Sequence, residues 1–176
     1  QLIERIRETD LHISGVSETR RLALTGLPWE IVPAHAWPGA VNIDETASQR
    51  AADYCAETVA RMARFDSTLT TLAEALDYGC GAAEIVWTIE LGGYHRPSAL
   101  VCVHQESLVT DSLSTWKLRV RTTDSGYSGV DTTAEPYKWL INHPRSVGPS
   151  LFRGGLLRAA MPYCCYKRYG LQWWMS

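Results

Sequence analysis

Five histidines and five cysteines are the side chains of this sequence best suited to metal binding or nucleophilic chemistry. Their spacing matches no short motif that holds a metal or a nucleotide. No two histidines stand four residues apart, and neither HExxH nor CxxC occurs. No serine lies in a GxSxG elbow, and no glycine cluster fits GxGxxG or GxxxxGKS/T. The sequence therefore predicts no catalytic residue, no metal and no cofactor, and we interpret the protein as a non-enzyme.

Two histidines and one aspartate leave an alternative open. His104 and His143 fall at the ends of expected strands and could lie close together in space, with Asp111 beside them. Such a group could hold a metal ion or exchange protons in a metal-dependent DNA-processing domain. The competing interpretation is hydrogen-bonded residues at strand ends. We favour it because nothing in the local sequence fixes a ligand geometry.

The odd number of cysteines, without a CxxC pair, indicates free thiols. Cys55 falls on the apolar face of an expected helix and Cys102 inside an apolar strand pattern. We expect both to be buried in a protein of a reducing compartment. The adjacent Cys164 and Cys165 are poorly placed to bridge each other.

Charged residues beside glycines and strands offer two further candidates. Gly154–Gly155 precede the last expected helix and are flanked by Arg153 and Arg158. This arrangement could hold an anion at the helix N-terminus, but we favour a turn that lets the helix start at a sharp angle. Glu84 is an acid within a strong strand pattern. It needs no partner if it faces outward and an arginine if it is buried.

Aromatic side chains gather with basic residues near the C-terminus, where Lys167–Arg168 stand among Tyr163, Tyr166, Tyr169, Trp173 and Trp174. With Arg20–Arg21 they could form a nucleic-acid surface. We favour packing on a core or on a neighbouring subunit, because seven tryptophans in a chain of 176 residues indicate large buried contacts.

The composition is that of one globular domain, which we place over residues 1–176. Hydrophobic residues make up 45% and charged residues 20% of the chain. A net charge of −2 argues against a surface dominated by phosphate binding, but it permits a channel through which nucleic acid passes. No apolar run approaches the ~20 residues of a membrane helix. The chain begins at Gln1 and ends inside an expected helix, so we interpret it as a fragment.

The stretch Asp66–Leu91 is the best-specified part of the chain. Its apolar residues at helical spacing predict a helix that Asp66 or Ser67 caps and Gly79 ends. The pattern then alternates, which predicts a strand, and Gly92–Gly93 predicts a hairpin turn. One face of that strand carries Ala83, Ile85, Trp87, Ile89 and Leu91.

Helices are expected on the N-terminal side of this stretch and strands on its C-terminal side. The helices are residues 2–7, residues 11–25 with Asp10 as N-cap, and residues 44–64 with Asn42 and Glu45 at capping-box spacing. Strands are expected at 29–32, 100–104, 116–121 and 137–143, and a last helix from Leu156 onward, with Pro162 inside it. Because helices and strands segregate, we predict an α+β fold with a mainly antiparallel sheet packed against several helices.

Three blocks together resemble the portal proteins of Mu-like phages and prophages. They read TRRLALTGLPWEIVPA (Thr19–Ala34), LAEALDYGCGAAEIVWTIELGGY (Leu72–Tyr94) and INHPRSVGPSLFRGGLLRAAMPYCCYKRYGLQWW (Ile141–Trp174). Each block alone is a weak signal, whereas the order and spacing of all three are fairly specific. The chain departs from the family at Ala159, where relatives often carry proline.

The resemblance implies a structural subunit of a ring, typically dodecameric, at one vertex of the virion capsid, assembled in the bacterial cytoplasm. Double-stranded DNA would pass through the ring, and terminase and then head-completion or tail proteins would dock on it. The chain would correspond to the wing region, without the stem and tunnel loop. The family's functional residues are not catalytic, and our own candidates for subunit contacts or structural roles are Glu84, Trp87, Arg153, Arg158, Tyr169 and Trp173. A small self-contained adaptor module remains a third interpretation.

Overall fold

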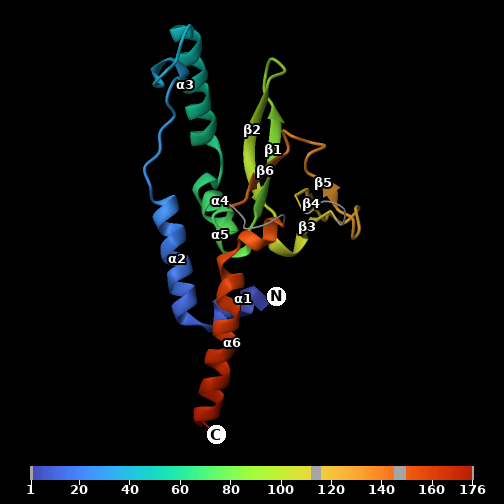
Figure 1. Ribbon diagram of the computed structural model, residues 1–176. Coiled ribbons are helices and arrows are strands. Elements are labelled where there is room, and N and C mark those ends of the chain that lie inside the picture. The colour runs from blue at the N-terminus through green and yellow to red at the C-terminus, as the bar shows by residue number, and fades with distance from the viewer. Residues whose placement is uncertain (1, 112–115, 145–149, 176) are drawn as a thin grey trace.

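A computed structural model describes residues 2–111, 116–144 and 150–175 of the chain. Helices fill the N-terminal half, strands follow, and a long helix ends the chain, so the predicted α+β class is confirmed. The molecule is elongated, as Figure 1 shows, with α3 and a β-hairpin toward one end and α6 at the other.

Two helices joined at a sharp bend open the chain. α1 spans Leu2–Thr9 and α2 spans Leu11–Thr25. The Asp10 carboxylate accepts the backbone N–H groups of His12 and Ile13, which confirms the predicted N-cap. The predicted strand at 29–32 is wrong, because the segment is an extended connection without strand pairing that leads to the short helix η1 (Ala34–Ala36).

α3 spans Glu45–Arg61, and Asp44 rather than Asn42 caps it. The Asp44 carboxylate accepts the N–H groups of Thr46 and Ala47, whereas Asn42 lies in the left-handed region with φ 56°. The buried face of α3 is narrower and more polar than predicted, since only Ser48, Ala52 and Thr58 are buried in it.

The predicted helix after Asp66 is two short helices, α4 (Phe65–Leu72) and α5 (Ala75–Tyr78). The predicted cap at Asp66 or Ser67 is wrong, because α4 already begins at Phe65, after Arg64 in a left-handed conformation. Gly79 ends α5 with φ 99°, which confirms the predicted glycine stop.

The main sheet contains β1 (Gly81–Ile89), β2 (His95–Cys102) and β6 (Trp139–Asn142), in the order β2-β1-β6. All pairs are antiparallel. Gly92 and Gly93 both have positive φ and make the predicted turn between β1 and β2. A register shift between Val86 and Trp87 interrupts the simple alternation predicted for β1.

A second small sheet was not predicted. It pairs β3 (Leu108–Thr110), β4 (Leu118–Val120) and β5 (Val130–Asp131), all antiparallel. The predicted strand at 116–121 is confirmed only in its centre. The short helix η2 (Gln105–Ser107) joins the two sheets. The core lies where they meet and comprises Cys80, Ala82, Leu108, Leu118, Val120, Trp139 and Leu151.

The chain ends in the short helix η3 (Leu151–Gly154) and the long helix α6 (Leu156–Met175). α6 contacts α5 and α1 and then runs past the body of the molecule, with Pro162 inside it (Figure 1). Among the described residues, no helix is both long and apolar enough to cross a membrane.

Candidate assembly surface

A cluster of charged side chains joins α1, α2 and α5. Arg21 of α2 donates to Glu74 at an Nη1–Oε1 distance of 2.8 Å, and Arg7 of α1 approaches the same carboxylate at 3.3 Å. Arg21 also pairs with Glu18. Only 11% of the Arg21 side chain is exposed, so this cation is held by carboxylates rather than by water. The cluster fixes how the N-terminal helices sit on the rest of the fold.

Asp77 is the most buried member of the cluster, and Ser17 of α2 donates its hydroxyl to it. Arg7 lies 3.8 Å from Asp77 and donates to the Tyr78 hydroxyl at 3.3 Å. Burial raises the pKa of Tyr78, although Arg7 opposes the shift. We refer to Arg7, Ser17, Arg21, Glu74, Asp77 and Tyr78 as the helix junction.

Two glycines let a third segment reach this junction. A Cβ on Gly79 would lie 2.7 Å from the Leu151 carbonyl oxygen, and one on Gly155 would lie 2.5 Å from that of Asp77. Both distances are shorter than real Cβ contacts, so the backbones of α5 and of the turn before α6 meet directly at these positions. This packing fits the turn interpretation of Gly155.

The flanking arginines stand outside that contact. Arg153 and Arg158 are both exposed. Arg158 borders a hollow between α1 and α6 that is also lined by Leu2, Tyr78 and Phe152. Their side chains do not converge with Gly154–Gly155 on a defined anion pocket among the described residues.

Glu84 and Trp87 lie in the middle of β1 and face the segment before β6. Lys138 Nζ lies 3.7 Å from a Glu84 oxygen and 3.3 Å from a Glu135 oxygen. Glu84 is 41% exposed at its side chain, so its partner inside the chain is a half-exposed lysine and not a buried arginine. The Trp87 indole N–H donates to the Tyr137 carbonyl at 2.8 Å, while its ring stays exposed.

Aromatic side chains on α6 point into solvent. Tyr169 is 73% exposed and Trp173 is 85% exposed. The aromatic side chains of Tyr163, Tyr166 and Trp174 and the aliphatic side chain of Leu171 are exposed as well. Exposed aromatic side chains gathered on one helix are a common feature of surfaces that contact other molecules.

The alternative site predicted from His104, Asp111 and His143 does not form a metal-binding group in the structure. His104 accepts the Glu106 backbone N–H and lies 3.7 Å from Glu4. Asp111, at the far end of β3, pairs with Arg119 at 3.4 Å. His143 is exposed just beyond β6. Over residues 2–111, 116–144 and 150–175, no group of three or more His, Cys, Asp or Glu side chains is arranged to hold a metal ion.

The cysteines that are buried in the structure are not the ones predicted to be buried. Cys55 is exposed, because α3 turns this residue away from its narrow buried face, and Cys102 is only partly buried. Cys80 and Cys164 are the buried thiols. Burial raises the pKa of Cys80 to about 12. It raises that of Cys164 as well, since the thiolate would lose its hydration.

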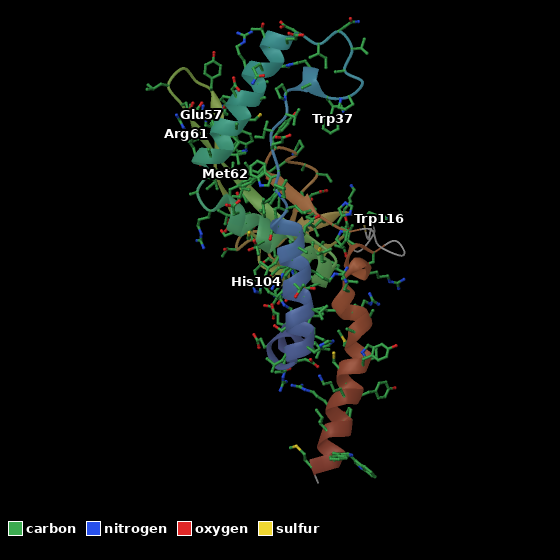
Figure 2. All side chains as sticks on the ribbon, turned by 90° about the vertical axis from the view of Figure 1, so that its left-hand side faces the viewer. Trp37, Glu57, Arg61, Met62, His104 and Trp116 are labelled. Carbon is green, nitrogen blue, oxygen red and sulfur yellow. The ribbon has the colours of Figure 1, made fainter. Side chains whose placement is uncertain are left out.

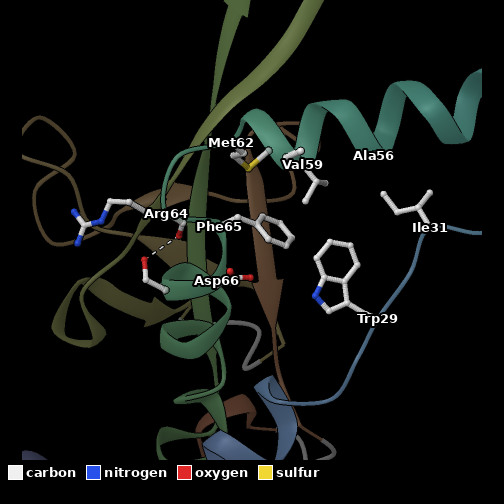
Figure 3. Close-up of a pocket in the computed structure, with 10 residues that line it drawn as sticks. Trp29, Ile31, Ala56, Val59, Met62, Arg64, Phe65 and Asp66 are labelled. Carbon is white, nitrogen blue, oxygen red and sulfur yellow. Dashed lines mark hydrogen bonds between the residues drawn. The ribbon is translucent and has the colours of Figure 1, made fainter.

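A groove of about 720 Å³ opens between the connection after α2 and the α3–α4 bend (Figure 3). Trp29 and Ile31 line one wall, and Val59, Met62 and Phe65 line the other. The Trp29 and Phe65 rings lie 5.6 Å apart between centroids, at 57°. Sequence reasoning missed this groove because it assigned Trp29–Val32 to a strand.

The helix junction was missed as well, although its position carried a signal. Arg21 lies in the block Thr19–Ala34, and Glu74 and Asp77 lie in the block Leu72–Tyr94. Gly155 belongs to the third block, Ile141–Trp174. Blocks that are far apart in the sequence thus meet at one place, through ion pairs and direct backbone contact.

Comparison with known proteins agrees with this reading of the blocks. The profile of the family described as "Portal protein of Mu bacteriophage" matches residues 1–176. The chain is 26% identical over 174 residues to a protein of Escherichia phage Mu named "Portal protein". The match covers 95% of this chain and 30% of that relative.

Proposed function

Because the chain belongs to the family of Mu bacteriophage portal proteins, we propose that it is the wing region of a subunit that assembles into a portal ring at the capsid vertex. The role is structural, and the protein has no catalytic activity of its own. Double-stranded DNA passes through the ring during packaging and ejection. Terminase and then head-completion or tail proteins dock on the assembled ring.

The observation that carries this proposal is the pairing of a fixed scaffold with unsatisfied outer surfaces. The helix junction and the Gly79–Gly155 contact hold the three blocks rigidly together. In contrast, α6, the hairpin and the groove expose large apolar side chains to solvent. Exposed apolar surface of this extent is typical of a subunit that completes its packing in an assembly.

The alternatives are less well supported. The metal-dependent DNA-processing domain needs His104, Asp111 and His143 together, and the first two have separate partners. A self-contained adaptor module leaves the exposed aromatic side chains of α6 without a use.

Electron microscopy of the full-length gene product tests the proposal. We expect ring-shaped particles with an axial hole. A monodisperse monomer at micromolar concentration, from an intact gene and under several salt conditions, would contradict the portal assignment of function.

A further inference from the structure

We propose that α6 is a hinged helix. The residues after Pro162 swing relative to the start of the helix, and the ion pair between Asp10 and Lys167 holds the helix in the closed position that the structure shows. We call this ion pair the latch. The inference concerns a motion within one chain, so it does not depend on whether copies of the chain form a ring.

Pro162 makes one point of α6 easier to bend than the rest. Because proline has no backbone N–H, the Arg158 carbonyl cannot receive the helical hydrogen bond that residue 162 would otherwise donate. The proline ring also crowds that carbonyl. Sharp bends in helices are commonly found at proline for these two reasons. We therefore place the hinge at Pro162.

The hinge lies between two points at which α6 is attached. Before it, Gly155 packs so closely that a Cβ there would lie 2.5 Å from the Asp77 carbonyl oxygen, and Leu157 is buried. After it, Lys167 Nζ lies 2.9 Å from the Asp10 carboxylate. Figure 2 shows from a second side what Figure 1 shows, that the C-terminal end of α6 extends past the bend between α1 and α2. The first attachment is backbone packing, whereas the second is one ion pair.

The packing of α6 on α1 is incomplete on both sides of the hinge. A hollow of about 530 Å³ is lined by Met161 and by Leu2 of α1, and another of about 510 Å³ is lined by Leu2 and Cys164. Every side chain at positions 165–171 and 173–175 is exposed. The later part of α6 thus buries little apolar surface, and segments of this kind open at low cost in free energy.

The latch has the properties of a contact that can open and close again. The Lys167 side chain is 55% exposed, and an ion pair with an exposed partner contributes little free energy. Asp10 is held in place independently of Lys167, since its carboxylate also accepts the backbone N–H groups of His12 and Ile13. Lys167 also holds the pKa of Asp10 below its usual range, so the carboxylate is charged at neutral pH.

Cys164 reports the position of the hinge. Its side chain is 8% exposed and lines the same hollow as Ile6 of α1, whereas the adjacent Cys165 is exposed. Because Cys164 lies after Pro162, a swing moves it away from α1 and uncovers its thiol. The thiol of Cys80 is buried in the core, outside α6, and a swing leaves it covered.

Alkylation by N-ethylmaleimide tests the latch in the full-length gene product carrying Cys165→Ser, with each cysteine followed by mass spectrometry. Asp10→Asn keeps the cap of α2, because asparagine caps as well as aspartate, but removes one charge of the latch. Lys167→Met removes the other charge. We expect each change to speed the reaction of Cys164 by about two- to fivefold. The negative charge of Asp10 raises the pKa of Cys164 and the positive charge of Lys167 lowers it, so a faster reaction in both variants reports opening rather than charge.

The hinge is tested by Pro162→Ala, which restores the missing helical hydrogen bond. This variant should react more slowly at Cys164 than the wild type, and it should cancel most of the increase when combined with Asp10→Asn. Arg168→Met is the matched control, because Arg168 is the neighbouring exposed cation and pairs with no carboxylate in the part of the chain that the structure describes. It should react at the wild-type rate.

Four results would overturn the proposal. They are a wild-type rate in both latch variants, an increase in only one of them, a combined variant as fast as Asp10→Asn alone, and a parallel increase at Cys80, which would mean that the whole chain has loosened. A gene product that forms no rings refutes the proposed function but leaves the hinge to be decided by these rates.

Discussion

At the scale of single residues, the most informative position is Arg21, because its neighbour in the sequence behaves so differently. Arg20 is exposed, while Arg21 reaches inward to Glu74 and Glu18. Since both residues are arginine, the residue type does not explain why one side chain is exposed and the other is not. The difference arises because only one of two adjacent positions on a helix can face the body of the protein.

Removing the inner arginine should therefore be costly. We expect Arg21→Ala to lower the free energy of unfolding by about 1–2 kcal/mol, because the partly buried Glu74 loses the shorter of its two ion pairs and keeps only the 3.3 Å contact with Arg7. Arg20→Ala is the matched control and should change the free energy by less than about 0.5 kcal/mol. Urea unfolding followed by circular dichroism gives both values. Equal effects from the two variants would contradict the helix junction.

Two glycines of the C-terminal segment make a similar pair. Gly155→Ala places a Cβ 2.5 Å from the Asp77 carbonyl oxygen, so we expect a loss of more than about 2 kcal/mol of stability. Gly170→Ala meets nothing within 4 Å inside α6, and we expect a gain of about 0.5–1 kcal/mol, since alanine favours helix. Thermal unfolding should move in opposite directions for the two variants, and a shared direction would argue against the close backbone contact.

The buried thiol of Cys80 predicts a pH dependence. Its pKa in the folded protein is about 12, above the ordinary value of 9.0, so the unfolded chain releases the proton first as pH rises. The thiol's contribution to stability is complete below pH 9 and is lost as pH rises toward 12. Cys80→Ala should flatten the fall of stability in this range. At neutral pH, an exposed thiol such as Cys55 should react with Ellman's reagent much faster than Cys80.

At the scale of elements, the Arg96 cation links the hairpin to α3. Arg96 of β2 lies 4.8 Å from the centre of the Tyr54 ring of α3 and 3.1 Å from Glu90. It also approaches Glu57 of α3 at 4.0 Å. Because the end of β1 near the turn is exposed, the contacts of the buried Arg96 stabilise a part of the hairpin that has little hydrophobic core of its own.

We expect Arg96→Ala to release the hairpin from α3. Amide hydrogen exchange should speed up across β1 and β2 near the turn, while the sheet close to the core stays protected. Arg121→Ala is the control, because the Arg121 guanidinium stacks on Tyr127 in the same surface loop, and the backbone bond from Arg121 to the Ser107 carbonyl survives the change. Unchanged exchange in the hairpin of the Arg96 variant would show that other contacts hold it.

At the scale of the whole molecule, α6 is the element whose exposed aromatic side chains are available for contacts with other molecules. Its outer half carries aromatic side chains in solvent beside Lys167, which pairs with Asp10 at 2.9 Å and ties this helix to the start of α2. The helix is thus anchored near its middle to the start of α2. An anchored helix with an exposed aromatic surface is suited to contacts with other subunits.

Replacing Tyr163, Tyr166 and Tyr169 together by serine tests this view. Because all three are exposed and serine has a similar helix propensity, thermal unfolding of the chain should stay within a few degrees of the wild type. Ring formation by the full-length gene product should fall sharply in the same variant. Assembly at the wild-type level would show that these aromatic side chains serve another purpose.

The sequence alone determined the local elements whose signals are complete within a few residues. The Asp10 cap, the Gly79 stop and the Gly92–Gly93 turn depend on side-chain and backbone preferences of neighbouring positions, and the structure confirms them. The three blocks also placed the chain in its family. Predictions failed where two alternatives have similar local signals. Asn42 was predicted as the cap of α3 instead of Asp44, and Trp29–Val32 was predicted as a strand instead of an extended connection.

Only the tertiary structure decided which side chains meet across long distances in the chain. The pairing of Arg21 with Glu74, the contact of Gly79 with the Leu151 segment, and the groove between Trp29 and Phe65 join residues separated by dozens of positions. No local preference encodes such contacts, because they depend on how rigid elements orient once their apolar faces are buried. For the same reason His104, Asp111 and His143 could be grouped from the sequence, whereas among the described residues the fold arranges no such group to hold a metal ion.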